Sequence, residues 1–173
     1  AVEGGYDCTA PIDITKASAS FGFTDSGVVS TIDDLGRYAR AEAEQALRTQ
    51  QEPARYGSPL PVSATAQTWY QVTGGAFLVG GMVGQQGWVP GYATSAYSDP
   101  GSGLTVAVSL NNSTRGSSIA AYLAWELAAI ASKAPAAEGQ SSPGFALPFT
   151  AEQYHQTITD AAVVCQAPAA EGE

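Results

Sequence analysis

The hydrophobic pattern of this chain switches to a period of two after residue 67, and that switch limits the folds open to it. Between residues 68 and 110, alternating or apolar segments are separated by glycine-rich breaks, the clearest being Asp-Pro-Gly-Ser-Gly at residues 99–103. Side chains of a strand alternate between its two faces, and short strands joined by such turns pair antiparallel. We expect an antiparallel sheet of three or more strands, drawn from residues 68–72, 76–79, 83–89, 92–98 and 104–110.

Helical patterns flank these strands. Residues 31–48 begin with a capping hydroxyl, from Ser30 or Thr31, and continue with apolar residues at helical spacing. Residues 118–133 carry an apolar stripe of Ile119, Tyr122, Leu123, Leu127 and Ile130, which alanines and Trp125 widen, so this helix should be heavily buried. A capping-box pattern predicts a short last helix after Thr150. The predicted class is α+β, with helix 118–133 on the sheet and helix 31–48 in a neighbouring helical part or at the rim.

Charge and hydropathy exclude two classes of partner. The 173 residues include 7 Lys and Arg against 16 Asp and Glu, which gives a formal net charge of −9. Nucleic acid and anionic membranes are bound by clustered basic residues, so we expect neither as a partner. The most apolar run, residues 119–131, contains Glu126 and is shorter than the roughly 20 residues that span a bilayer. We expect no transmembrane segment.

Two cysteines, Cys8 and Cys165, stand near opposite ends of the chain. We expect a disulfide between them, which would contribute about 2–4 kcal/mol, and two independent buried thiols are the alternative. A low lysine content with many Ser, Thr and Gln residues is typical of exported proteins, so we expect an extracytoplasmic location, secreted or in the cell envelope. No metal-type spacing and no glycine-rich phosphate loop is present, so we expect no metal and no cofactor.

Two further sites could carry chemistry. His155, the single histidine, stands among polar neighbours and is interpreted as a solvated surface residue. The tripeptide Asp25-Ser26-Gly27 has the core pattern of the aspartic peptidases, in which two such aspartates share a proton. This chain has one copy, so that chemistry would require a dimer. A turn leading into helix 31–48 is the simpler interpretation.

Read together, the segments resemble one family. Residues 27–35, Gly-Val-Val-Ser-Thr-Ile-Asp-Asp-Leu, resemble the Gly-hydrophobic-Ser-Thr-x-x-Asp-Leu stretch of the serine β-lactamases and D-alanyl-D-alanine carboxypeptidases, the penicillin-binding-protein-like family. Residues 84–92, Gly-Gln-Gln-Gly-Trp-Val-Pro-Gly-Tyr, are similar to its Gly-His-Thr-Gly-x-x-Pro-Gly-Tyr, and the strand, turn, strand and Asn-Asn-Ser of residues 97–113 follow in the family's order. The resemblance covers roughly residues 20–133.

This resemblance implies the C-terminal half of the penicillin-recognising fold. It divides the chain into an irregular N-terminal segment (1–29), a β-lactamase-like C-terminal portion (30–133) and an extended C-terminal segment with a short helix (134–173). Half of a fold leaves apolar sheet surface exposed unless something covers it. We expect the cover to be either the rest of the protein or residues 134–173 folding back.

The nucleophile of that family is absent here. Its members form a covalent acyl-enzyme with the serine of a Ser-x-x-Lys motif. The two lysines of this chain, Lys16 and Lys133, follow Asp13 and Ile130 by three positions, so no such motif exists. In the family the motif lies in the N-terminal half, and this chain begins with Ala1 rather than Met. We expect that half to be missing, removed naturally or by design, and we expect no catalytic residue in this chain.

The resemblance also implies a substrate-binding segment at Gln85, Gln86, Gly87 and Trp88. The family has a positive or switchable residue and a hydroxyl where the two glutamines stand, and amides hydrogen bond but supply no charge. Gly87 would let substrate approach, and the backbone N–H of Trp88 would be an oxyanion-hole donor; an ordinary core or edge aromatic is the alternative. A strand edge would turn one glutamine to a cleft and the other to the core, whereas a surface loop would leave both solvated.

Three functions follow from these patterns. The favoured one is the C-terminal portion of a serine hydrolase that recognises peptidoglycan peptides or β-lactams, inactive alone, with the missing N-terminal half as its partner. The second is a non-catalytic exported binding or interaction protein that kept the fold, which the two glutamines favour. The third is an unrelated exported structural domain or hydrolase, including the Asp25 hypothesis.

Overall fold

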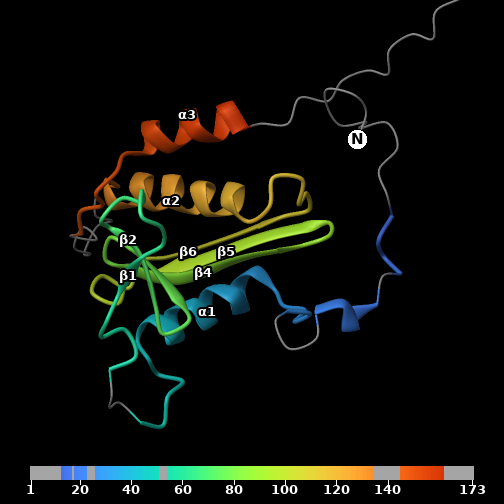
Figure 1. The fold of residues 1–173 in the computed structure, drawn as a ribbon, viewed down its shortest axis with the longest axis horizontal. Coiled ribbons are helices and arrows are strands. Elements are labelled where there is room, and N and C mark those ends of the chain that lie inside the picture. The colour runs from blue at the N-terminus through green and yellow to red at the C-terminus, as the bar shows by residue number, and fades with distance from the viewer. Residues whose placement is uncertain (1–12, 17, 23–25, 51–53, 135–144, 162–173) are drawn as a thin grey trace, which may run out of the picture.

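The computed structural model describes residues 13–16, 18–22, 26–50, 54–134 and 145–161. One sheet of six strands has α1 on one face and α2 on the other, with α3 beside α2 (Figure 1). The elements are η1 (Ala19–Gly22), α1 (Ile32–Ala43), β1 (Leu60–Pro61), β2 (Tyr70–Thr73), β3 (Ala76–Val79), β4 (Met82–Val89), β5 (Tyr92–Ser98), β6 (Thr105–Leu110), α2 (Ser118–Ser132) and α3 (Ala151–Ala161). The α+β class and the antiparallel sheet packed against a helix are confirmed.

The strands follow one another through the sheet in chain order, each antiparallel to the next. Strand β4 pairs with β5 from Val83 to Val89, but with β3 only over residues 82–84. The part of β4 from residue 85 onward therefore has a paired side and an open side. This open stretch of β4 contains the segment that the sequence singled out for substrate binding.

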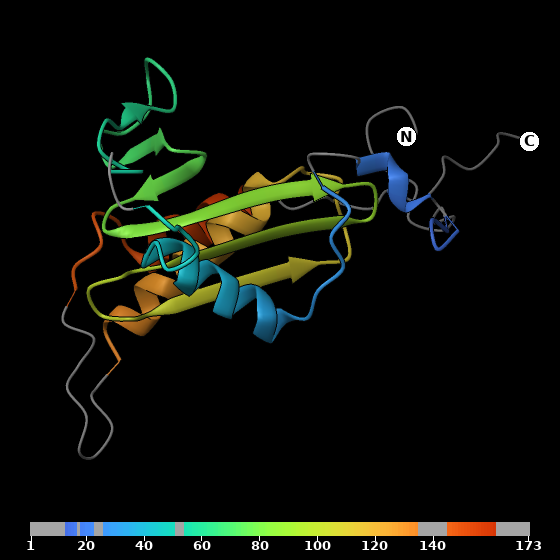
Figure 2. The ribbon, with the colours of Figure 1, turned by 90° about the horizontal axis from the view of Figure 1, so that it is seen from below.

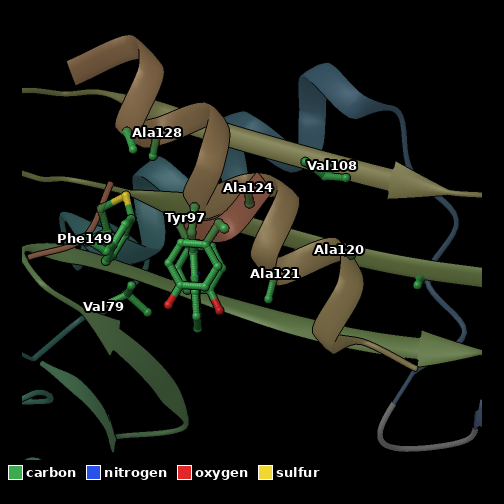
Figure 3. Close-up of a cluster of buried hydrophobic side chains, with 13 residues drawn as sticks. Val79, Tyr97, Val108, Ala120, Ala121, Ala124, Ala128 and Phe149 are labelled. Carbon is green, nitrogen blue, oxygen red and sulfur yellow. The ribbon is translucent and has the colours of Figure 1, made fainter. Parts of the chain in front are cut away.

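Helix α2 packs on the sheet through small side chains. Its buried residues are Ala120, Ala121, Ala124, Trp125, Ala128 and Ala129. The helix is heavily buried as predicted, through the alanines and Trp125 that widen its apolar stripe, but Leu127 and Ile130 of that stripe are 46% and 53% exposed. Alanines let the helix approach the strands closely, and the ring of Tyr97 fills the space between them (Figure 3). The helix is anchored where the hydroxyl of Ser95 donates to the carbonyl of Ala120 at 2.7 Å.

Helix α1 packs directly on the opposite face of the sheet, against β4, β5 and β6 (Figure 2). The alternative that placed it at the rim is therefore wrong. Thr31 caps its N-terminus as predicted, accepting from the N–H of Asp34 at 3.2 Å. The helix ends at Ala43 rather than near residue 48, because Gln45 adopts a positive φ of 56° and the chain turns away.

Residues 145–161 fold back against α2. Phe149 and Tyr154 are buried, and both rings contact Trp125, with centroids 6.1 and 5.1 Å away. Phe149 also lies 5.0 Å from the ring of Trp69, which joins this segment to the start of β2. The segment thus covers apolar surface beside α2. None of the helices in the described residues is long and apolar enough to cross a membrane.

Candidate functional site

The open side of β4 presents backbone groups that pair with no strand in the described part of the chain. The N–H of Gln86 donates to its neighbour's side chain, Oε1 of Gln85, at 2.9 Å instead of to β5. Backbone N–H groups alternate in direction along a strand, and the β4–β5 register runs without a bulge from residue 83 to 89. The N–H of Trp88 therefore points to the same open side as that of Gln86. A backbone N–H that faces this open side can donate a hydrogen bond to a ligand bound there.

The two glutamines lie on opposite faces of the sheet. Gln85 is opposite Ala96 in the register and is exposed on the α1 side, where its Nε2 donates to the carbonyl of Gly75 at 2.9 Å. Gln86 faces the core: its Oε1 accepts from the hydroxyl of Tyr97 at 2.7 Å, and its Nε2 lies 3.4 Å from the hydroxyl of Tyr70. Both amides therefore already have partners within the chain.

The tyrosines around Gln86 are neutral groups. Burial raises the pKa of Tyr97 far above its ordinary value, and burial also raises that of Tyr70. Each hydroxyl therefore keeps its proton over the whole physiological range, and the Tyr97 hydroxyl donates to Gln86. This network holds the core face of β4 in place and offers no charge to a ligand.

A cleft of about 410 Å³ separates α1 from the same stretch of the sheet. Its α1 wall consists of Leu35, Tyr38, Ala39 and Glu42, and its floor includes Gln85, Gly87 and Thr94. The end near the turn between β2 and β3 is lined by Arg55 and Gly75. The cleft is thus apolar and aromatic along its helical wall and charged at one end.

Arg55 and Glu42 form an ion pair at that charged end. Nη2 of Arg55 lies 2.5 Å from Oε1 of Glu42, and the two side chains are only 27% and 13% exposed. Nε of Arg55 also donates to the carbonyl of Gly74 at 2.9 Å. Through these bonds Arg55 ties the connection after residue 54 to α1 and to the β2–β3 turn.

The glycines of β4 have different surroundings. A Cβ at Gly84 would meet the carbonyl oxygen of Ala96 and the ring of Tyr97 well inside van der Waals distance, so packing alone requires that glycine. A Cβ at Gly87 would meet nothing within 4 Å, and its φ is not positive. Neither packing nor backbone conformation requires a glycine at position 87. A glycine inside a strand often marks the close approach of a ligand or of another backbone.

The remaining residues singled out in the sequence lie away from the cleft or outside the described residues. The Trp88 side chain is 58% exposed on the α2 side of the sheet. His155 is exposed and pairs through Nδ1 with Oε1 of Glu126 at 2.9 Å, between α3 and α2. Cys8, Cys165 and Asp25 lie outside the described residues, so the disulfide and the aspartic peptidase hypothesis stay predictions.

The cleft holds no assembled nucleophile among the described residues. Thr94 supplies the hydroxyl of the floor, but no hydrogen bond connects it to a base in the described part of the chain. The described residues also contain no cluster of three or more His, Cys, Asp or Glu that could hold a metal. Among the described residues, the cleft offers open backbone, an arginine and an apolar wall.

Sequence reasoning missed the Arg55–Glu42 pair. Arg55 stands in a proline-containing stretch, residues 50–66, that has no usable period. A weak signal existed on the other partner. Glu42 follows Leu35 and Ala39 at helical spacing, so a helix packed by those residues turns Glu42 to the same side.

Comparisons with known proteins give one match. A family model described as Beta-lactamase matches residues 3–129. Searches of the curated proteins and of the solved structures found no match. The matched range includes α1, the whole sheet and most of α2, and so contains both walls of the cleft.

Proposed function

The chain belongs to the β-lactamase family, and on that premise we propose that it is the ligand-recognising C-terminal portion of a serine hydrolase of this family. The ligand would be a peptidoglycan peptide or a β-lactam, as for the penicillin-binding proteins and D-alanyl-D-alanine carboxypeptidases that the motifs resemble. It would lie along the open side of β4, with Gly87 beneath it and the N–H of Trp88 as a donor.

One observation carries this proposal. Gly87 stands in the middle of a regular strand, on an open edge and in a cleft, with empty space where its side chain would be. A glycine weakens a strand, so a side chain would be expected at this position if the strand served only the fold. Close approach of a ligand to the backbone would explain why a glycine stands at position 87.

Catalysis would require residues from outside this chain. No Ser-x-x-Lys occurs in the sequence, and the hydroxyl of the cleft floor has no base bonded to it among the described residues. We therefore expect this chain to bind without turning over its ligand, and the missing N-terminal half of the same protein would be the partner that supplies the nucleophile. The protein would be exported, secreted or held in the cell envelope, with Cys8 and Cys165 bridged.

A non-catalytic exported binding protein is the second candidate. This candidate is favoured because the side-chain amides of Gln85 and Gln86 both form hydrogen bonds within the chain. Where the family resemblance places a charged group and a hydroxyl for the substrate, this chain uses amides to hold its own turn and core. A protein that only binds can tolerate that change, because no proton has to be relayed.

The test is a comparison of Gly87→Val with Gly101→Ala, a control at the turn between β5 and β6. Binding of benzylpenicillin and of a peptide ending in D-Ala-D-Ala would be measured by ligand-observed NMR, with nitrocefin turnover measured in parallel. We expect Gly87→Val to weaken binding at least fivefold while Gly101→Ala leaves it unchanged, and we expect no turnover by any variant.

Three results would contradict the proposal. If Gly87→Val leaves ligand binding unchanged, the ligand does not bind at the β4 edge. If the original chain binds neither ligand, the proposed recognition of these ligands is wrong. Nitrocefin turnover that is lost on changing one of the chain's own serines would show that the nucleophile is here.

A further inference from the structure

We infer that the outer edge of β6 is a self-association surface, through which two copies of this chain pair antiparallel into one continuous sheet. Strand β6 is the last strand of the sheet, and within the described residues no strand pairs with its outer side (Figure 2). The inference does not depend on the ligand proposed for the cleft, because it concerns the backbone of β6 and not that of β4.

Every second residue of β6 directs its backbone groups away from β5. The N–H of Asp99 donates to the carbonyl of Leu104 at 2.8 Å, which fixes the phase of the hydrogen bonds between the two strands. Backbone groups of a strand alternate between its two sides, so those of Thr105, Ala107 and Ser109 face outward. A row of such groups is a template on which another strand can pair.

The two edges of the sheet differ in their protection against such pairing. At the other edge, β1 has only two residues, and one of them is Pro61. Short length, proline and charged side chains are the usual protection of an edge strand. The six residues of β6, Thr-Val-Ala-Val-Ser-Leu, include neither a proline nor a charged residue. At about 3.3 Å per residue, β6 therefore offers an unprotected edge about 20 Å long.

A twofold axis perpendicular to the sheet at Ala107 pairs β6 with its own copy. Ala107 then lies opposite its counterpart in the second copy, and Thr105 lies opposite Ser109, so that the outward N–H and C=O groups meet. This rotation keeps each face of the sheet on its own side. Val106 therefore meets Val108 of the second copy on the α2 face, and no charged residue of β6 faces another.

Helix α2 has an exposed apolar flank on the same side. Leu127 and Ile130 are 46% and 53% exposed. Helix α3 contacts the opposite flank, at Tyr122 and Glu126. At 3.6 residues per turn, Leu127 lies about 140° from Tyr122 around the helix axis. The segment before α3 contacts the ring of Trp69, beside β2, so α3 lies on the β2 side of α2 and Leu127 on the β6 side.

One rotation covers both the edge and this flank. The axis at Ala107 places the two α2 helices side by side on one face of the joined sheet, with Leu127 of each copy toward the other. An edge about 20 Å long and about 30 Å deep, for one sheet between two helical layers, buries roughly 1,200 Å² in total, the size of a small but stable interface. A single strand from another protein would cover the backbone and leave Leu127 exposed, so a second copy is the better fit.

The experiment measures the mass of the chain in solution by sedimentation velocity over a range of concentrations. We expect a monomer–dimer equilibrium. Ala107→Pro removes an outward N–H without removing a bond to β5, and Leu127→Lys places two positive charges side by side across the axis. Each should weaken the dimer at least tenfold. The matched control, Leu60→Lys, changes another exposed leucine at the opposite edge and should leave the dimer unchanged.

Hydrogen exchange locates the contact. In the original chain, the amides of Thr105, Ala107 and Ser109 should gain protection as the concentration rises, and Leu127→Lys should abolish that gain. Circular dichroism checks that each variant folds, and if Ala107→Pro does not, Leu127→Lys decides the point.

Three results would overturn the inference. A chain that stays monomeric at every concentration has no self-association surface, and the β6 edge then belongs to a different partner. A dimer that persists in Leu127→Lys, or that leaves the Ala107 amide unprotected, uses another surface. Failure of the ligand to bind in the cleft would contradict the proposed function alone, because none of these measurements involves the ligand.

Discussion

At the scale of single residues, two glycines of one strand have opposite reasons to be there. Gly84 faces the core beneath Tyr97, and a methyl group there would collide with the backbone of β5 as well as with the ring. Gly87 faces open space in the cleft. Glycine is therefore required for packing at position 84, whereas at position 87 it leaves the backbone accessible from the cleft.

Alanine substitution separates these two roles. We expect Gly84→Ala to lower the free energy of unfolding by about 1–3 kcal/mol, because a backbone carbonyl cannot move aside as a side chain can. Gly87→Ala should leave it unchanged or raise it by about 0.5–1 kcal/mol, because alanine loses less entropy on folding. Urea unfolding followed by circular dichroism measures both, and equal effects of the two substitutions would contradict the assignment.

At the scale of elements, the end of α1 contains a correctable strain. Gln45 adopts a φ of 56°, in the left-handed region that favours glycine after a helix, and its Oε1 accepts from Nη1 of Arg48 at 3.0 Å. The N–H of Ala46 bonds to the carbonyl of Ala41, which closes the last turn. The loop after α1 therefore needs this conformation whatever residue supplies it.

Gln45→Gly should relieve that strain. We expect the free energy of unfolding to rise by about 0.5–1 kcal/mol, a gain reduced by the loss of the partly buried bond to Arg48. Gln45→Ala is the control, because it removes the same bond but keeps a Cβ, and it should not stabilise the chain. Thermal unfolding of the two variants decides the point: if the glycine variant melts no higher than the alanine variant, the backbone at residue 45 is not strained.

Sequence reasoning predicted the elements better than their faces. The strands after residue 67 were predictable because glycine-rich turns separate segments with a period of two, and the cap of α1 because Thr31 precedes two aspartates. The short strand β1 (Leu60–Pro61) was not, because it lies in a proline-containing connection. The burial of α2 was predictable because alanines and Trp125 widen its apolar stripe, whereas the exposure of Leu127 and Ile130 was not. Close helix-to-sheet packing prefers the small residue when a partner such as Tyr97 fills the volume.

The candidate site was predictable only along the strand. The segment from Gln85 to Trp88 stands out through local spacing, and alternation then places its side chains on their faces. Arg55 was not predictable, because its place in the cleft depends on how a connection without periodicity crosses α1 and the β2–β3 turn. A tertiary contact of that kind leaves no local pattern.

At the scale of the whole molecule, buried tyrosines link stability to alkaline pH. Burial raises the pKa of Tyr70, Tyr97 and Tyr154 above the ordinary value of 10.0. Because the pKa of these tyrosines is raised in the folded state, their contribution to the free energy of unfolding is present in full below the pKa that they have in the unfolded chain. That contribution is lost as the pH rises above it, because only the unfolded chain then releases these protons.

We therefore expect the free energy of unfolding to be flat through neutral pH and to fall above about pH 10. Each buried tyrosine that stays protonated adds a slope of about 1.4 kcal/mol per pH unit. Urea unfolding at a series of pH values measures the slope, and tyrosinate absorbance follows the ionisation. Tyr97→Phe should make the slope shallower by one tyrosine, and a stability that stays constant into strong alkali would refute the linkage.

The sheet in which every strand pairs with its successor has a consequence for folding kinetics. Neighbours in the sheet are neighbours along the chain, so the strands can pair through short loop closures, and low contact order is associated with fast folding. Helix α1 is an exception, because it contacts β5 and β6 from about 60 positions earlier in the chain. Its docking closes a much longer loop than those between the strands, so the wall opposite β4 should form after the sheet, and local opening of α1 would expose the cleft before the sheet itself begins to unfold.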